Sequence, residues 1–344
     1  MRKILLWLII VAILLGLALA TITYFKFVVG SEVPEGIGKE YVVIPTGSEF
    51  DEVVSLLKEK EVIQNEETFR LLAERMNYKR SPMRSGRYLI KGGWTQIDLI
   101  RQLRNGKQSP VDVVLTNERL IENVAAKVAR FIEPDSLAFL EIMEDENYLQ
   151  EIGYTPETLM SLFIPNTYEF FWNTQPRDFM TRMQREHKKF WKANKRAQKA
   201  EALGLTPAEV YTLASIIERE TLRNDEKPRM AGVYVNRLKK GMLLQADPTA
   251  VFATKDFGVK RVLNYHTQFD SPYNTYKYAG LPPGPISMAS ISSIDGVLNV
   301  EKHDYIYFCA KGDGSGYHSF AKSLQGHNRN AARYRENLRK RGLR

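Results

Sequence analysis

The residue best placed for acid–base chemistry is a glutamate near the end of a well-specified helix. Residues 206–221 read TPAEVYTLASIIERET, in which Thr206 can cap the first turn and Pro207 suits the first helical position. The helical period places Glu218 on or beside the apolar face and points Glu220 elsewhere. Because burial disfavours a charged carboxylate, we expect Glu218 to have a raised pKa, as a general acid at neutral pH requires. The alternative is a structural ion pair between Glu218 and a nearby arginine: Arg219, Arg223 or Arg237.

Two later segments are rich in side chains that could bind a sugar. In residues 233–249 and 271–286, amides, hydroxyls and tyrosines lie close to turn-forming prolines and glycines. Aromatic rings stack on the apolar faces of sugars, and amide and hydroxyl groups bind sugar hydroxyls. We therefore predict a carbohydrate cleft, with ordinary loop structure as the alternative for any single residue. The predicted substrate-binding residues are Asn236, Gln245, Asp247, Thr249, Tyr273, Asn274, Thr275 and Tyr276.

The N-terminus carries an apolar segment that is long enough to cross a membrane. Residues 4–25 contain no charged side chain, and about 20 residues suffice to span the hydrocarbon layer as a helix. Arg2 and Lys3 precede the segment, so the positive-inside rule favours a cytoplasmic N-terminus and an exported remainder. We expect a single-pass anchor in the cell membrane. A cleaved signal peptide, with a cleavage site at residues 18–20, and a buried core helix are the alternatives.

Composition excludes several classes of protein and of site. The 344 residues include 49 Lys and Arg against 40 Asp and Glu, a net charge of +9. The single cysteine, Cys309, excludes an intrachain disulfide framework and a zinc site built from cysteines, and five histidines leave little material for another metal site. The positive balance favours an acidic partner, such as nucleic acid, anionic lipid or an acidic wall polymer. Because the chain is expected to be exported, nucleic acid is the least favoured of these.

The spacing of apolar residues predicts an α+β fold. Residues 31–39 are rich in glycine and read as a linker, and residues 40–116 read as a small unit of strands and short helices. The predicted strands are 40–44, 86–90, 111–115 and 305–310, and the predicted helices are 49–60, 65–76, 95–104, 119–131, 135–144, 156–162, 176–201, 206–222 and 228–240. Beyond residue 243 we expect long polar and aromatic loops.

Several long motifs together resemble one known family. They are ASIIERET, VNRLKKGMLLQADPT, SPYNTY and GLPPGPI, in this order, with related blocks at residues 164–170 and 318–328. This arrangement resembles the endolytic murein transglycosylases, also called MltG or YceG-like, over residues 40 to 330. Three positions depart from the family pattern: residues 160–163, Asn166 and Gly326 stand where the family usually has carboxylates, so no role can be carried over to them.

The resemblance implies an organisation and an activity. It implies a cytoplasmic tip and transmembrane helix at 1–30, a linker at 31–39, a LysM-like domain at 40–116 and a catalytic domain at 117–344. It implies endolytic cleavage of the β-1,4 bond between N-acetylmuramic acid and N-acetylglucosamine in nascent peptidoglycan, with a 1,6-anhydro product, which would end glycan elongation. Glu218 falls on the catalytic glutamate. Neither a metal nor an organic cofactor is implied, and peptidoglycan synthases are conceivable partners beside the glycan and the inner membrane.

Two other functions stay open at this point. A membrane-anchored scaffold could bind peptidoglycan without cutting it, and Glu218 would then be structural. A hydrolytic muramidase would need a second carboxylate facing Glu218, and Asp247 is the candidate. The two enzymes differ in their products, because a hydrolase leaves a reducing muramic end and a transglycosylase leaves an anhydro end.

Overall fold

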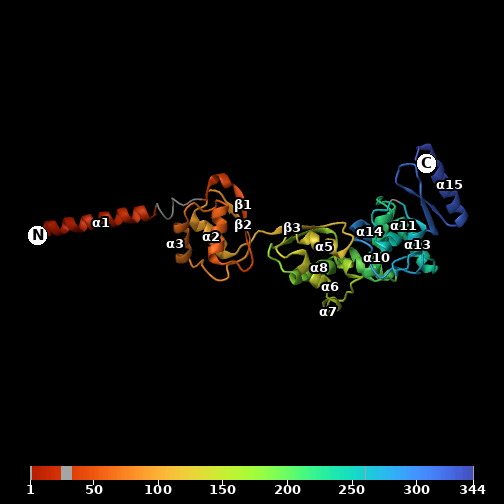
Figure 1. Ribbon diagram of the computed structural model, residues 1–344, viewed down its shortest axis with the longest axis horizontal. Coiled ribbons are helices and arrows are strands. Elements are labelled where there is room, and N and C mark those ends of the chain that lie inside the picture. Colours follow the sequence, from red (N-terminus) through yellow and green to blue (C-terminus); the bar gives the residue numbers. More distant parts are fainter. Residues whose placement is uncertain (1, 25–32, 260, 344) are drawn as a thin grey trace. The chain divides into compact units, whose positions relative to one another are not determined.

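A computed structural model describes residues 2–24, 33–259 and 261–343 and confirms a mixed α+β protein (Figure 1). Its contacts divide the chain into two compact units. The first comprises Met1–Asp112, Phe131–Glu133 and Glu169–Thr174, and the second comprises Val113–Arg130, Pro134–Tyr168 and Gln175–Arg344. The end of the predicted membrane segment and the start of the predicted linker lie outside the described residues, and the predicted domain limits stay predictions.

The first helix has the length and composition of a membrane span. Helix α1 covers Arg2–Tyr24, and its stretch Ile4–Ile22 has a mean hydropathy of 2.9 with none of it buried inside the protein. Within the described ranges it is the one helix that is long and apolar enough to cross a membrane. An exposed helix of this kind needs an apolar environment, so α1 is consistent with a single-pass anchor.

The rest of the first unit is a two-stranded sheet covered by helices. After a 3-10 turn at Glu35–Ile37, the order is β1 (Lys39–Ile44), α2 (Phe50–Glu59), α3 (Glu66–Arg75), β2 (Gly86–Lys91) and α4 (Gln96–Asn105). Strands β1 and β2 are antiparallel, with Val42 opposite Tyr88. Their buried faces and the helices enclose one apolar core, in which the rings of Phe50 and Phe69 are stacked.

The second unit is mainly helical and carries two small sheets. Its elements are β3 (Val111–Leu115), α5 (Ile121–Val128), α6 (Ser136–Glu144), α7 (Glu146–Glu151), a 3-10 turn (Leu159–Leu162), β4 (Asn166–Phe170), α8 (Pro176–Lys192), a 3-10 turn (Ala193–Lys195), α9 (Arg196–Ala202), α10 (Pro207–Glu220), α11 (Lys227–Lys239), α12 (Asp247–Thr254), α13 (Asn264–Gln268), α14 (Ile291–Leu298), β5 (Tyr307–Ala310), β6 (His318–Ala321) and α15 (Leu324–Lys340). Strand β3 pairs with β4, and β5 pairs with β6.

Three predictions of elements are wrong in this unit. The predicted helix 176–201 is two helices, because Asn194 and Lys195 adopt the left-handed conformation with φ of 53° and 57°, which an α-helix cannot contain. The predicted helix 156–162 is a single 3-10 turn. The region beyond residue 243, predicted as loops, contains the short helices α12, α13 and α14 and the long helix α15, and α14 and α15 begin at capping serines.

Helix α10 is the central element of the second unit. Its N-terminus has the predicted capping box, in which Thr206 and Glu209 bond each other's backbone amides. Residues Val210 to Ile217 are all buried, and the helix packs on α11, α12 and α14 (Figure 1). A helix buried on every side has little freedom to shift, so the residues at its C-terminal end are held in fixed positions.

Candidate active site

Glu218 lies in the last turn of α10 and is tied to neighbouring elements. Its carboxylate accepts hydrogen bonds from the hydroxyls of Ser290 and Ser293 and forms an ion pair with the Lys227 ammonium group at 3.2 Å. Ser290 is the N-cap of α14, and Lys227 begins α11. Glu218 therefore joins three helices through one carboxylate.

This environment corrects the expected pKa of Glu218. Burial does raise it, but the bonds from Ser290 and Ser293 and the charge of Lys227 outweigh that effect, so the pKa of Glu218 lies below its ordinary value. The prediction of a raised pKa is wrong because the partners lie on other helices: Ser290 and Ser293 are 72 and 75 residues away in the sequence, and Lys227 begins the next helix. The alternative of a structural ion pair is realised, although with Lys227 instead of an arginine.

Glu220, the last residue of α10, has the environment that was expected of Glu218. Burial is the main cause that raises the pKa of Glu220 to about 7; the charge of Asp247 adds to the rise, and the Tyr234 hydrogen bond and Arg237 oppose it. The Tyr234 hydroxyl donates to a Glu220 carboxyl oxygen at 2.8 Å. The two carboxyls, two residues apart, are thus pushed in opposite directions, as in enzymes that need one protonated acid at neutral pH.

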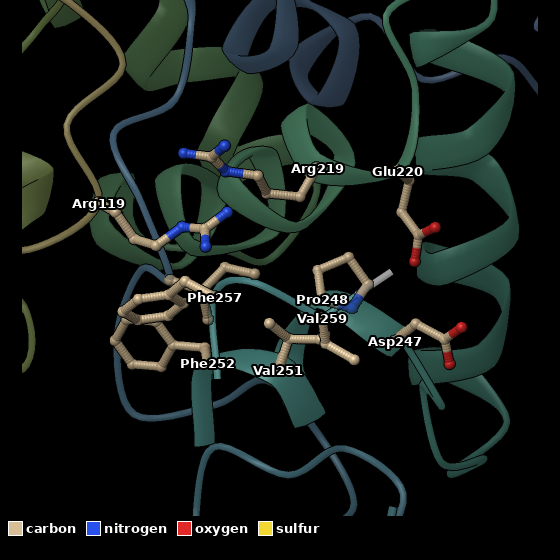
Figure 2. A pocket seen from close by; sticks show the side chains of 10 residues that line it. Arg119, Arg219, Glu220, Asp247, Pro248, Val251, Phe252, Phe257 and Val259 are labelled. Atoms are coloured by element: carbon tan, nitrogen blue, oxygen red, sulfur yellow. The ribbon is translucent and has the colours of Figure 1, made fainter. Parts of the chain in front are cut away.

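Glu220 and Asp247 line a pocket of about 330 Å³, called here the Glu220 pocket. Figure 2 shows their carboxyl groups on one side and the guanidinium groups of Arg119 and Arg219 on the other. The remaining lining residues are Pro248, Val251, Phe252, Phe257, Val259 and Ile286. The pocket therefore combines an apolar floor with two acidic and two basic groups, a composition that is typical of a binding site for a polar ligand.

Glu220 also lines a second hollow, of about 710 Å³, which we call the C-terminal hollow. Its other lining residues come from the loop after α10 and from the β5–β6–α15 region: Thr221, Leu222, Arg223, Ala310, Gly312, Gly314, Ser315, Gly316, Tyr317, His318, Tyr334, Leu338 and Arg341. Glu220 is the residue that the two hollows share. A long ligand could therefore extend to either side of this carboxyl.

Four of the predicted substrate-binding residues have partners inside the protein. The Asn236 amide donates to the carbonyl oxygens of His303 and Tyr305 at 2.8 and 3.0 Å. The buried Asn274 amide donates to three carbonyl oxygens between residues 266 and 269. The buried hydroxyls of Thr249 and Thr275 bond each other at 2.8 Å. These side chains shape the loops, and their contact with a glycan stays a prediction.

Of the other four, one lines the Glu220 pocket. Asp247 lines it and accepts a hydrogen bond from the Tyr276 hydroxyl at 2.5 Å. Tyr273 lines an adjoining pocket, and its ring lies 4.8 Å from that of Phe252, centroid to centroid. Gln245 is exposed, with a left-handed φ of 49°. Asp247 is thus the predicted binding residue that shares a pocket with Glu220.

The sequence analysis did not single out Glu220, Arg119 or Arg219, all of which line the Glu220 pocket. The helical period points Glu220 away from Glu218, and the structure agrees, because Glu218 bonds Ser290 and Lys227 whereas Glu220 bonds Tyr234. Arg119 is brought in by a backbone bond from Met288 to the carbonyl oxygen of the preceding residue at 2.7 Å. One feature of the sequence could have indicated Glu220 and Arg219: residues 218–220 read ERE, which is two carboxylates on either side of an arginine. No group of three metal-ligating side chains occurs in the described part of the chain.

Comparison with known proteins identifies the family of this chain. The sequence profile of the YceG-like family matches residues 42–333. The chain belongs to the YceG-like family. It is 30% identical to an endolytic murein transglycosylase of Bacillus subtilis over 311 residues, which are 85% of this chain and 83% of the relative.

More distant relatives agree with this membership. An endolytic murein transglycosylase of Streptococcus pneumoniae is 28% identical over 90% of this chain, which spans 61% of that longer protein. The crystal structure of a YceG-like protein from Listeria monocytogenes has a TM-score of 0.55 and 28% identity, and it covers 85% of this chain and 98% of its own. The family resemblance of the motifs is therefore confirmed.

Proposed function

We propose that this chain is a membrane-anchored endolytic peptidoglycan lytic transglycosylase with Glu220 as its acid and base. It cleaves the β-1,4 bond between N-acetylmuramic acid and N-acetylglucosamine. The observation that carries the proposal is one carboxyl with a pKa of about 7 in the wall of a pocket of a YceG-like protein. The names of the relatives from B. subtilis and S. pneumoniae support the reaction class.

Glu220 has the protonation state that bond cleavage requires. With a pKa of about 7, roughly half of the molecules carry the proton at pH 7. The protonated carboxyl donates this proton to the glycosidic oxygen as the bond to C1 of the muramyl residue breaks. Glu218, whose pKa is lowered, stays ionised at this pH and has no proton to donate. We therefore assign the acid to Glu220, in place of the Glu218 that the family resemblance implied.

The same carboxyl completes the reaction. Once ionised, Glu220 removes the proton from the C6 hydroxyl of the muramyl residue, and that oxygen attacks C1 to close a 1,6-anhydro ring. The proton given to the leaving sugar is replaced by the proton taken from C6, so Glu220 is regenerated and no water is consumed. An internal nucleophile held near C1 makes a second catalytic carboxylate unnecessary.

The position of Glu220 between two hollows supports cutting inside a strand. An endolytic enzyme must hold sugars on both sides of the bond that it breaks. The Glu220 pocket, of about 330 Å³, and the C-terminal hollow, of about 710 Å³, offer such room. We assign the muramyl residue to the Glu220 pocket and the continuing strand to the C-terminal hollow.

A hydrolytic muramidase is the second candidate, because Asp247 shares the pocket with Glu220. A hydrolase uses its second carboxylate to activate water or to attack C1. The products separate the two reactions. Full-length protein in detergent is incubated with uncrosslinked glycan strands, and the fragments are analysed by mass spectrometry. Anhydro-muramyl ends are expected; reducing muramyl ends that disappear in an Asp247→Asn variant would establish the hydrolase instead.

The remaining features of the proposal concern location and the first unit. We place the N-terminus in the cytoplasm, α1 in the inner membrane and the rest of both units outside it, because Arg2 and Lys3 lie ahead of the apolar stretch of α1. Protease digestion of intact spheroplasts tests the orientation, because only an exported remainder is degraded.

The strand–helix–helix–strand order from β1 to β2 supports a LysM-like, glycan-binding role for the first unit. Cutting of nascent glycan strands beside the peptidoglycan synthases would end the elongation of those strands.

A further inference from the structure

Arg119 and Arg219 form a cationic pair on the side of the Glu220 pocket opposite its two carboxyl groups. Both line the Glu220 pocket, and neither takes part in an ion pair in the part of the chain that the structure describes. Arg219 donates a hydrogen bond from Nε to the Ser287 hydroxyl at 3.2 Å, which fixes its direction but supplies no negative charge. The carboxylate nearest in sequence, Glu218, is bonded to Ser290, Ser293 and Lys227.

The surroundings make this pair unfavourable without an anion. Burial lowers the pKa of Arg119, and the positive charge of Arg219 lowers it further. Burial also lowers the pKa of Arg219, although the residue is partly exposed and the charge of Glu218 opposes the shift. The Arg119 guanidinium is held over the Phe257 ring at 4.4 Å, so it cannot simply move away into solvent without losing that contact. Two fixed, partly desolvated cations are a receptor for a carboxylate, which each can bind through two parallel N–H groups.

The chemistry of the proposed substrate supplies such a group. A muramyl residue carries a lactyl ether on C3, and its carboxyl is either free or linked to a stem peptide that has carboxylates of its own. C3 is two ring positions from C1, so its substituent leaves the ring in a different direction from the bond that Glu220 protonates. Figure 2 shows the same separation in the protein, with the guanidinium groups across the pocket from Glu220.

We propose that Arg119 and Arg219 bind a carboxylate on the C3 substituent of the muramyl residue at the cleavage site. This inference rests on the proposed function and adds the basis of its substrate specificity: strands that are charged at this position are cut in preference to neutral ones. The pair orients the sugar so that its C1 oxygen faces Glu220. It is a binding pair and takes no part in proton transfer.

The test compares matched glycan strands on the full-length protein in detergent. One pair of strands is peptide-free, with the lactyl carboxyl either free or converted to its methylamide. A second pair carries stem peptides with their carboxyls free or amidated. The readout is the ratio of kcat/KM for the acid to kcat/KM for the amide, measured on the same protein, so a general loss of activity in a variant cancels. One charge-assisted hydrogen-bonded contact predicts a ratio of about ten or more for the wild type.

The variants assign the preference to residues. In Arg119→Gln and Arg219→Gln the ratio should fall toward one, and Arg119→Lys should keep only part of it, because lysine has the charge without the fork. The matched control is Arg177→Gln, which removes one positive charge from the surface of α8 and should keep the wild-type ratio.

Each outcome has a defined meaning. A preference in the peptide-free pair identifies the lactyl carboxylate, and a preference only in the second pair identifies the stem peptide. Equal rates for acid and amide in both pairs, or a preference that both glutamine variants retain, would overturn the inference. Titration calorimetry of the same fragments on a Glu220→Gln protein separates this from the proposed function. If the wild type cuts no strand yet the acid binds about tenfold more tightly than the amide, the proposed reaction fails and the anion site stands.

Discussion

Replacing the two glutamates of the ERE sequence one at a time should produce two different defects. Glu220→Gln keeps a group that can accept the Tyr234 hydrogen bond but holds no transferable proton. General acid–base catalysis contributes about 10²- to 10⁴-fold, so kcat should fall by at least about 100-fold. Because burial of an ionised carboxyl is relieved, the free energy of unfolding at pH 8 should stay the same or rise.

Glu218→Gln should instead damage stability. The Lys227 side chain is 4% exposed, and the substitution leaves its charge without a carboxylate. Breaking a buried pair costs about 3–5 kcal/mol, and we expect the lower end because Lys227 also donates to Ser290 and Ser292 at 3.2 and 2.9 Å. The assay is release of anhydro-muramyl ends per folded molecule, with urea unfolding of each protein. If Glu218→Gln abolished cutting while Glu220→Gln cut at the wild-type rate, the assignment of the acid to Glu220 would be refuted.

Four further results are expected. In a pH series, kcat/KM should fall tenfold per unit above about pH 7, as Glu220 loses its proton. Tyr234→Phe removes a hydrogen bond that lowers the pKa of Glu220, so the midpoint of that fall should move to higher pH. In urea titrations, the stability of the wild type relative to Glu220→Gln should decrease from pH 4.5 to about 7, by at most about 3 kcal/mol, because folded Glu220 keeps a proton that unfolded Glu220 releases; the comparison cancels the opposite contribution of His187, whose pKa burial lowers to about 4. Gly284→Ala should lower the midpoint of thermal unfolding, since a Cβ there would lie 1.9 Å from the Glu157 carbonyl oxygen.

Local signals in the sequence were sufficient for α1 and α10 but not for the pKa of Glu218. Thr206, Pro207 and Glu209 specify the start of α10 through contacts within four residues, and the prediction of that helix is confirmed. The apolar run of α1 is equally local. The pKa of Glu218, by contrast, depends on Ser290 and Lys227, whose approach no local pattern encodes.

The pair formed by Arg119 and Arg219 could not be predicted from the sequence either, because it also depends on contacts between distant segments. Arg119 precedes α5, and Arg219 is the last residue but one of α10, so nothing local in the sequence links the two arginines. They meet because the segment from residue 286 to 290 contacts both regions. Met288 bonds the backbone before Arg119, and Ser287 bonds the side chain of Arg219. The pair can therefore be identified only once the position of residues 286–290 in the fold is known.

That same segment explains why a carboxylate without a proton to donate belongs beside the acid. Helix α10 holds residues 286 to 290 through three side chains: Ser215 accepts from the Ile286 amide at 3.0 Å, Tyr211 accepts from the Ala289 amide at 3.2 Å, and Glu218 accepts from the Ser290 hydroxyl. Ile286 itself lines the Glu220 pocket. An ionised Glu218 thus fixes the segment that bonds the backbone before Arg119 and the side chain of Arg219. In the proposed reaction, Glu218 positions this segment and Glu220 transfers the proton.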